Sequence, residues 1–360
     1  MFRLAPVALA AGLVAALVVA GAAPAAPPGT KYTVTPLVSN IPGVAPTTDA
    51  NLQNAWGLCR AATSPWWVAD NGSDKTTIYN GSGQLQMIGG TPFQGVAGAP
   101  TGCVFSGIAG QFLVGTAANP TALGTSNFVF DTEDGTILAW RGGSTAAVVT
   151  VPATPGAEFK GLAISNGASG PRLYAADFGT GSVDVFDGGW HKLTLPGAFV
   201  DPNLPSGYVP FGIQTIGSRV FVTYGIQNGT DELDRPAAGI VDVYDLDGVF
   251  LHRVATHGHL NAPWGLAQAP AGWGAFGGDL LVGNFGDGSI NAYAEQPDGS
   301  WEFVATMRDS SGKQLTIDGL WALEFGNAGS NGNPQTLYFT AGPNDEADGL
   351  FGTITPTPTS

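Results

Sequence analysis

The chain has 360 residues and a net charge of −15, with 44% hydrophobic residues, 54 glycines and only 11% charged residues. The hydrophobic content is enough for a core, which argues against disorder, and the acidic balance repels phosphate backbones, which argues against a nucleic-acid partner. Low charge with abundant glycine predicts an all-β protein with many tight turns.

The N-terminus, residues 1–25, has the pattern of a secretory signal peptide. One positive charge at Arg3 precedes an apolar run to Ala20, and the small residues Ala23-Pro24-Ala25 predict cleavage after Ala25. A membrane anchor is the alternative reading, but the run is slightly short for a span. We therefore expect a secreted protein with no membrane span after signal removal.

A short motif with a central glycine recurs along the rest of the chain, about every fifty residues. The sequence Trp-Gly-Leu occurs at 56–58 and again at 264–266. Related copies have their glycines or their tryptophan at Gly57, Gly102, Gly161, Gly212, Gly265 and Trp321. Glycine permits close backbone approach, so we expect these copies to be the innermost strands of a radial array, with tryptophan filling space near the axis.

Three further strands follow each copy. Segments such as residues 182–186 alternate with period two, and "DLDG" and "QPDG" are hairpin turns. The expected outer strands are 85–89, 146–152, 191–196, 250–256 and 301–307. Four-stranded sheets repeated radially are propeller blades. The sixth outer strand is missing from its place, and residues 31–39 would supply it by joining the last blade.

The predicted fold is thus an all-β, six-bladed β-propeller with four-stranded blades, closed by its N-terminal strand. A single domain spans residues 26–354, and residues 355–360 form a disordered tail. Cys59 and Cys103 follow equivalent glycines on adjacent inner strands. They are either a disulfide or two buried thiols, since an oxidising destination allows the bond.

Several segments resemble those of a secreted, uncharacterised bacterial family of NHL-like six-bladed propellers. They include "NAWGL", "ATSPWWVADNG", "LYAADF", "LNAPWGLA", "GDLLVGNFGDGSINAY" and "YFTAGPNDEADGLFG". The resemblance covers roughly residues 31 to 354 and implies fold and export, without an activity to transfer. Related six-bladed propellers include lactonases, streptogramin lyases and pure binding modules, so the fold alone does not give the function.

In a propeller, the start of each innermost strand and the loop between the second and third strands of each blade lie at the same end of the channel, here called the top rim. Carboxylates there are the predicted ligands of a Ca²⁺ ion: Asp70, Asp131, Asp177 and Asp318. Other rim residues are the predicted ligand-binding set: Asn54, Lys160, Tyr224, His259, Asn261 and Asn284. The alternative is that Asp and Asn before glycine only form turns by bonding their own backbone.

Two acidic loops, 228–239 and 342–349, carry further carboxylates. Asp231, Glu232, Asp234, Asp345, Glu346 and Asp348 would either bind Ca²⁺ at the surface or remain solvated. The sequence leaves two functions open. One is a binding propeller whose top face takes a small molecule, a glycan or a protein. The other is a metal-dependent hydrolase or lyase acting on a small ester, lactone or sugar derivative.

Overall fold

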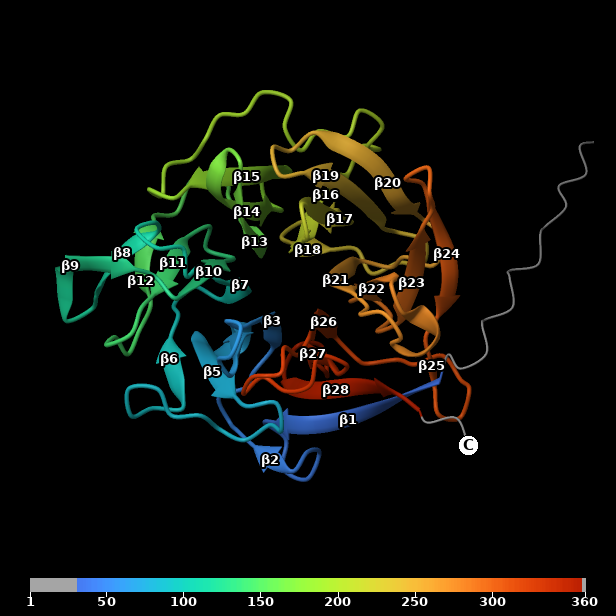
Figure 1. The fold of residues 1–360 in the computed structure, drawn as a ribbon, viewed down its shortest axis with the longest axis horizontal. Coiled ribbons are helices and arrows are strands. Elements are labelled where there is room, and N and C mark those ends of the chain that lie inside the picture. The colour runs from blue at the N-terminus through green and yellow to red at the C-terminus, as the bar shows by residue number, and fades with distance from the viewer. Residues whose placement is uncertain (1–30, 358–360) are drawn as a thin grey trace, which may run out of the picture.

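The computed structural model describes residues 31–357, which form six β-sheets around a central axis (Figure 1). The all-β propeller prediction is therefore confirmed. The predicted signal peptide and residues 358–360 lie outside the described residues. Within residues 31–357, no helix is long and apolar enough to cross a membrane.

Blades 1 to 3 follow the predicted order from the axis outward. Blade 1 holds β3 (Ala55–Cys59), β4 (Trp66–Asp70), β5 (Lys75–Tyr79) and β6 (Phe93–Gly95), with a 3-10 turn η1 (Asn71–Ser73). Blade 2 holds β7 (Pro100–Phe105), β10 (Phe128–Thr132), β11 (Ile137–Trp140) and β12 (Val148–Val151). Blade 3 holds β13 (Phe159–Gly167), β14 (Gly170–Asp177) and β15 (Ser182–Asp187).

Blades 4 to 6 complete the ring. Blade 4 holds β16 (Tyr208–Ile216), β17 (Arg219–Asn228), β19 (Ile240–Asp245) and β20 (Phe250–Thr256), with β18 (Asp231–Glu232) paired to β17. Blade 5 holds β21 (Pro263–Gln268), β22 (Leu280–Asn284), β23 (Ile290–Glu295) and β24 (Trp301–Thr306), with a 3-10 turn η2 (Gly274–Phe276). Blade 6 holds β26 (Leu320–Phe325), β27 (Leu337–Ala341), β28 (Leu350–Pro356) and β1 (Lys31–Ser39), flanked by β2 (Thr47–Thr48) and β25 (Arg308–Asp309).

The N-terminal strand closes the ring, as predicted. β1 pairs antiparallel with β28, from Tyr32 opposite Pro356 to Ser39 opposite Leu350, and the two strands lie side by side in Figure 1. Tyr32 is fully buried and stacks on Phe276, with ring centroids 5.5 Å apart. The last strand runs to Pro356, two residues beyond the predicted end of the domain.

Two predicted outer strands differ from the structure. In blade 1, residues 85–89 do not form the outer strand, because Gly89 and Gly90 adopt positive φ of 63° and 90° and turn the chain; Phe93–Gly95 takes that place. In blade 3, the segment 191–196 makes a single bridge from Lys192 to Phe186. Residues 193–195 already lie outside the ladder, and Pro196, which follows them, lacks the amide that a ladder needs.

A hairpin that the sequence patterns did not predict interrupts blade 2. It consists of β8 (Leu113–Thr116) and β9 (Asn119–Thr125), inserted between β7 and β10. Figure 1 shows it projecting outward from the ring beside β12. Pro120 inside β9 weakens the strand signal, because proline is uncommon in strands other than edges.

The recurring motif marks a β-bulge at the same place in every blade. Pairing between the first and second strands shifts register at each copy. A Cβ on Gly57 would lie 2.4 Å from Thr101 O, and one on Gly212 would lie 2.3 Å from Trp264 O. Each of these glycines therefore faces the backbone of the next inner strand, which confirms the predicted close approach.

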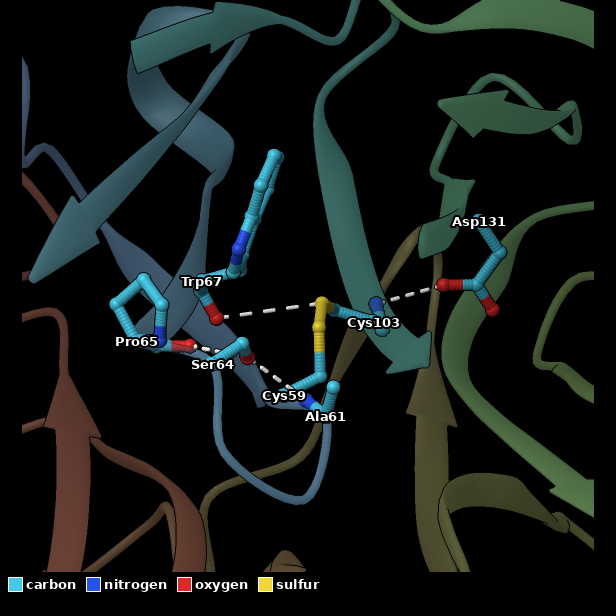
Figure 2. Close-up of a disulfide and its surroundings, with 8 residues drawn as sticks. Cys59, Ala61, Ser64, Pro65, Trp67, Cys103 and Asp131 are labelled. Atoms are coloured by element: carbon cyan, nitrogen blue, oxygen red, sulfur yellow. Dashed lines mark hydrogen bonds between the residues drawn. A yellow bond between two sulfur atoms is a disulfide. The ribbon is translucent and has the colours of Figure 1, made fainter. Parts of the chain in front are cut away.

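The core is divided among the blade interfaces. One buried hydrophobic cluster lies between each pair of neighbouring blades, and a seventh lies at the axis. The interface of blades 1 and 2 also carries a disulfide between Cys59 and Cys103, with Cα atoms 5.5 Å apart (Figure 2). The structure thereby decides between the bonded and the thiol alternatives.

Candidate functional site

The axis is closed by aromatic side chains close to the top rim. Trp56 and Trp321 stack with ring centroids 3.7 Å apart. Phe285 stacks on Trp321 as well, with ring centroids 4.1 Å apart. Trp264 meets both tryptophans edge-on, at 6.2 Å from Trp56 and 5.7 Å from Trp321. The tryptophans of the repeated motif thus fill space at the axis, as expected from the sequence.

Lys160 lies next to this aromatic plug and is almost fully buried. Its ammonium lies 5.2 Å from the centroid of the Trp56 ring and pairs with Glu133 and, at 2.9 Å, with Glu158. Burial lowers the pKa of Lys160, but the two carboxylates outweigh it and the net pKa is raised. Lys160 therefore stays charged. Its positive charge balances the charges of Glu133 and Glu158, and not those of the four aspartates of the predicted Ca²⁺ set.

A hydrogen-bonded network extends from this lysine across the rim. Asn54 donates to Asn71 at 3.2 Å and to Glu346, and accepts from the Trp321 indole at 3.1 Å. Asn71 in turn donates to Glu133 at 2.9 Å. The network links blades 1, 2, 3 and 6 through side chains, so it holds the top of the ring together.

The two acidic loops fold over the top rim and partly join this network. Burial raises the pKa of Glu232 to about 7, and the charges of Lys160 and Glu346 also act on it. Asp234 accepts from Asn261 at 2.6 Å, and Asp348 accepts from Asn40 at 2.8 Å. Sequence reasoning noted these loops by their charge but could not place them, and it missed Glu133 altogether.

The four aspartates of the predicted metal set all lie on the top side, and each bonds backbone amides of a loop or strand. Asp70 accepts from Thr77, Asp131 from Gly102, Asp177 from Glu158 and Thr180, and Asp318 from Asn344, over 2.6 to 3.1 Å. Figure 2 shows the Asp131 carboxylate bonded to the strand that carries Cys103. Within residues 31–357, no three His, Cys, Asp or Glu side chains form a group that could hold a metal. The calcium site stays a prediction.

Tyr224 is not open at the rim. It is 1% exposed, lies in the cluster between blades 3 and 4, and its hydroxyl bonds that of Tyr244 at 2.6 Å. Asn284 is also fully buried, and its amide donates to the His259 carbonyl at 2.8 Å and to Asp287 at 3.2 Å. These two residues support the rim from below.

A polar pocket of about 140 Å³ lies on the top rim between blades 4 and 5. It brings together His259 and Asn261, both predicted from the sequence, with side chains that sequence reasoning missed. Its polar lining consists of His259, Asn261, Asp287, Ser289, Asn291, Thr306 and Gln314. The His259 ring stacks on Phe303 with centroids 3.9 Å apart, which fixes the imidazole at the pocket edge.

Hydrogen bonding in this pocket is divided between wall and opening. Asn261 is held in the wall, since it accepts from the Arg235 amide at 2.8 Å and donates to Asp234. Thr306 donates to Asn291 at 2.7 Å. Among residues 31–357, the His259 ring, the second carboxylate oxygen of Asp287 and the Gln314 amide make no hydrogen bond. The pocket therefore offers donors and acceptors to a ligand.

Solved structures with the same architecture include proteins of unrelated function. The virginiamycin B lyase from Staphylococcus aureus matches with a TM-score of 0.50 and 12% identity, over 90% of this chain and 99% of that chain. The Neurospora crassa Pan2 WD40 domain matches with a TM-score of 0.51 and 11% identity, over 92% of this chain and 98% of that one. At such identities the likeness shows the fold alone.

No family model matches the sequence. Two uncharacterized proteins of Acanthamoeba polyphaga mimivirus do match it. Protein R648 is 30% identical over 340 residues, which are 90% of this chain and 80% of R648, and protein L690 is 34% identical over 203 residues, which are 54% and 51%. These relatives are viral and not bacterial, which corrects the source that the motifs suggested. The chain belongs to the same protein family as the uncharacterized mimivirus protein R648.

Proposed function

We propose that this protein is a binding propeller that takes a small, uncharged, hydroxyl-rich molecule of the saccharide class at the top rim. The observation that carries the proposal is the pocket between blades 4 and 5, where His259, Asp287 and Gln314 keep unused hydrogen-bonding groups. Ligand sites are concave and place a few polar groups to fix orientation. The rim pocket has this form, with Asn291 of β23 and Thr306 of β24 in a wall that loops otherwise build.

The ligand class follows from the chemistry of the lining. Amide, hydroxyl, imidazole and carboxylate groups donate to and accept from sugar hydroxyls, each of which both donates and accepts. Among residues 31–357, no Lys or Arg lines the pocket, so no permanent positive charge favours a phosphate or carboxylate there over a neutral ligand. Its volume of about 140 Å³ is well above the ~10–15 Å³ that a single water molecule needs, so it has room for a small molecule or one sugar ring.

The test is titration of monosaccharides by NMR and calorimetry against the full chain. Binding should be detectable at concentrations of about 10 mM or below, and His259→Ala and Gln314→Ala should each weaken it about three- to tenfold by removing one hydrogen bond. His252→Ala is the matched control, because His252 is exposed on β20, a strand that contributes nothing to the pocket. Equal loss in the control and the pocket variants would refute the assignment.

The calcium-dependent hydrolase or lyase is the competing proposal for the top face. Elemental analysis of the purified protein decides it first, and chelation should then lower the melting temperature, with added Ca²⁺ restoring it. Replacing Asp177 and Asp318 together by Asn should abolish that response. A protein that contains no divalent metal and ignores chelator leaves the binding propeller as the better proposal.

Export from the cell also stays a proposal. The signal pattern at residues 1–25 motivates it, and the Cys59–Cys103 disulfide supports it, because disulfides persist in oxidising compartments. Expression of the full chain in the source cell, followed by sequencing of the N-terminus of any protein found in the medium, tests both export and the cleavage site after Ala25.

A further inference from the structure

A second pocket opens at the opposite end of the channel, the bottom mouth. It has a volume of about 210 Å³ and is formed where the inner strands of blades 1, 2, 3, 4 and 6 end. It continues into a space of about 30 Å³ that is bounded by Trp264. The two share Leu58, Cys103, Gln214 and Glu324 in their walls. A ligand entering from the bottom would therefore stop below the aromatic plug.

Two ionisable side chains of opposite type lie in one wall of this pocket, and burial raises the pKa of the Glu324 carboxyl to about 7 although the neighbouring Arg60 lowers it. Arg60, at the end of β3, and Glu324, on β26, form an ion pair with nitrogen and oxygen 3.3 Å apart. Arg60 donates from Nε and Nη2 to the Phe325 carbonyl at 3.0 and 2.7 Å, and its guanidinium lies 5.3 Å from the Trp66 ring centroid. These contacts fix the orientation of the guanidinium.

Each member of this ion pair keeps a free side. Within residues 31–357, Arg60 Nη1 and the second carboxylate oxygen of Glu324 make no hydrogen bond. The side chains are only 16% and 25% exposed, and both line the pocket. A ligand with a single charge would meet one of these groups with the wrong sign, whereas a molecule with both charges complements the pair.

The facing wall belongs to blade 4, across the axis from blade 1. It carries Gln214 and Thr215 of β16, and the Thr215 hydroxyl is buried with no hydrogen-bond partner among the described residues. A buried polar group without a partner is unfavourable, so a ligand that reaches this hydroxyl would gain a hydrogen bond. Phe105 and Ile164 add apolar surface between the two walls.

We infer that the bottom mouth binds a small zwitterion of the α-amino-acid class. Its carboxylate accepts from Arg60, its ammonium donates to Glu324, and its side chain lies along Phe105 and Ile164 towards Gln214 and Thr215. The volume of about 210 Å³ is well above the ~10–15 Å³ that a single water molecule needs, so it has room for a small molecule. The site is separate from the rim pocket, because the two pockets share no lining residue.

The experiment is a calorimetric screen of the free amino acids against the full chain, at concentrations up to about 10 mM. We expect at least one to bind. Its decarboxylated amine and its deaminated acid should bind about tenfold more weakly, because each lacks one charge-assisted hydrogen bond. If neither the amino acids nor these analogues bind, or if one analogue binds as well as its parent, the inference is overturned.

Substitutions in the pocket then test whether the ligand binds there. Glu324→Gln should weaken binding about tenfold, and Glu295→Gln is the matched control, because Glu295 pairs with Arg219 outside the pocket at 2.6 Å. Gln214→Ala serves as a second pocket variant that leaves the ion pair intact, and it decides the matter if Glu324→Gln does not fold. Binding that is unchanged in the folded pocket variants would place the ligand elsewhere and refute the site.

Discussion

Removing the Cys59–Cys103 disulfide should destabilise the protein by a calculable amount. The bond joins β3 and β7, the inner strands of blades 1 and 2, and spans a sequence separation of 44 residues. The perturbation is the double substitution Cys59→Ala and Cys103→Ala. Both cysteines are buried, at 3% and 7% exposure, so alanine introduces no polar group that would need a partner.

The magnitude follows from loop closure in the unfolded chain. For a loop of about 44 residues, the chain-entropy model gives about 13 cal/mol/K, or about 4 kcal/mol at 25 °C. A chain of this size unfolds with an entropy of about 0.7 kcal/mol/K, so the melting temperature should fall by about 6 °C. The lost sulfur contacts in the cluster between blades 1 and 2 add to this loss.

The assay is calorimetric melting of wild type and double variant, each with and without a reducing agent. Reductant should lower the melting temperature of the wild type towards that of the variant and leave the variant unchanged. If the two proteins melt together under oxidising conditions, either the bond does not form or the unfolded chain is already constrained, and the reasoning above fails.

Three further perturbations test the architecture and its buried charges. Deleting residues 31–39 should lower the free energy of unfolding by about 3 to 6 kcal/mol, because Tyr32 and Val38 lose full burial; an unchanged melting temperature contradicts ring closure. Gly212→Ala should cost about 1 to 3 kcal/mol, because its Cβ would lie 2.3 Å from Trp264 O, whereas Gly142→Ala, with nothing within 4 Å, should be close to neutral in the same melting assay. Burial raises the pKa of Asp131 from 3.8 to about 7, so the folded state holds a proton that the unfolded state releases. The Asp131 carboxyl adds up to about 4 kcal/mol to the free energy of unfolding below pH 4, and this contribution is lost as the pH rises through 7. Asp131→Asn should therefore flatten the fall in the free energy of unfolding between pH 4 and 8, measured by denaturant titration.

Local patterns in the sequence carry most of the architecture. Five of the six copies of the motif carry a glycine at the bulge, where two backbones approach, as Gly57 does Thr101, and the sixth copy has Ala322 there. The missing outer strand predicts closure by residues 31–39 because an unpaired edge is costly. Register then places Asp70 opposite Ala55 and Asp177 opposite Phe159, so the top rim follows from the alternation of strand directions.

Side-chain partners were decided only by the tertiary structure. Lys160 was identified at the rim, but its partners Glu133 and Glu158 come from loops whose paths no periodic pattern fixes. The same limit applied to the rim pocket, where His259 and Asn261 were predicted while Asp287 and Gln314 were not. The bottom mouth was missed because Arg60 and Glu324 lie 264 positions apart and meet only when the ring closes. Strand order follows from local hydrogen bonding and hydrophobic period, whereas the contacts of a site depend on how six sheets pack around one axis.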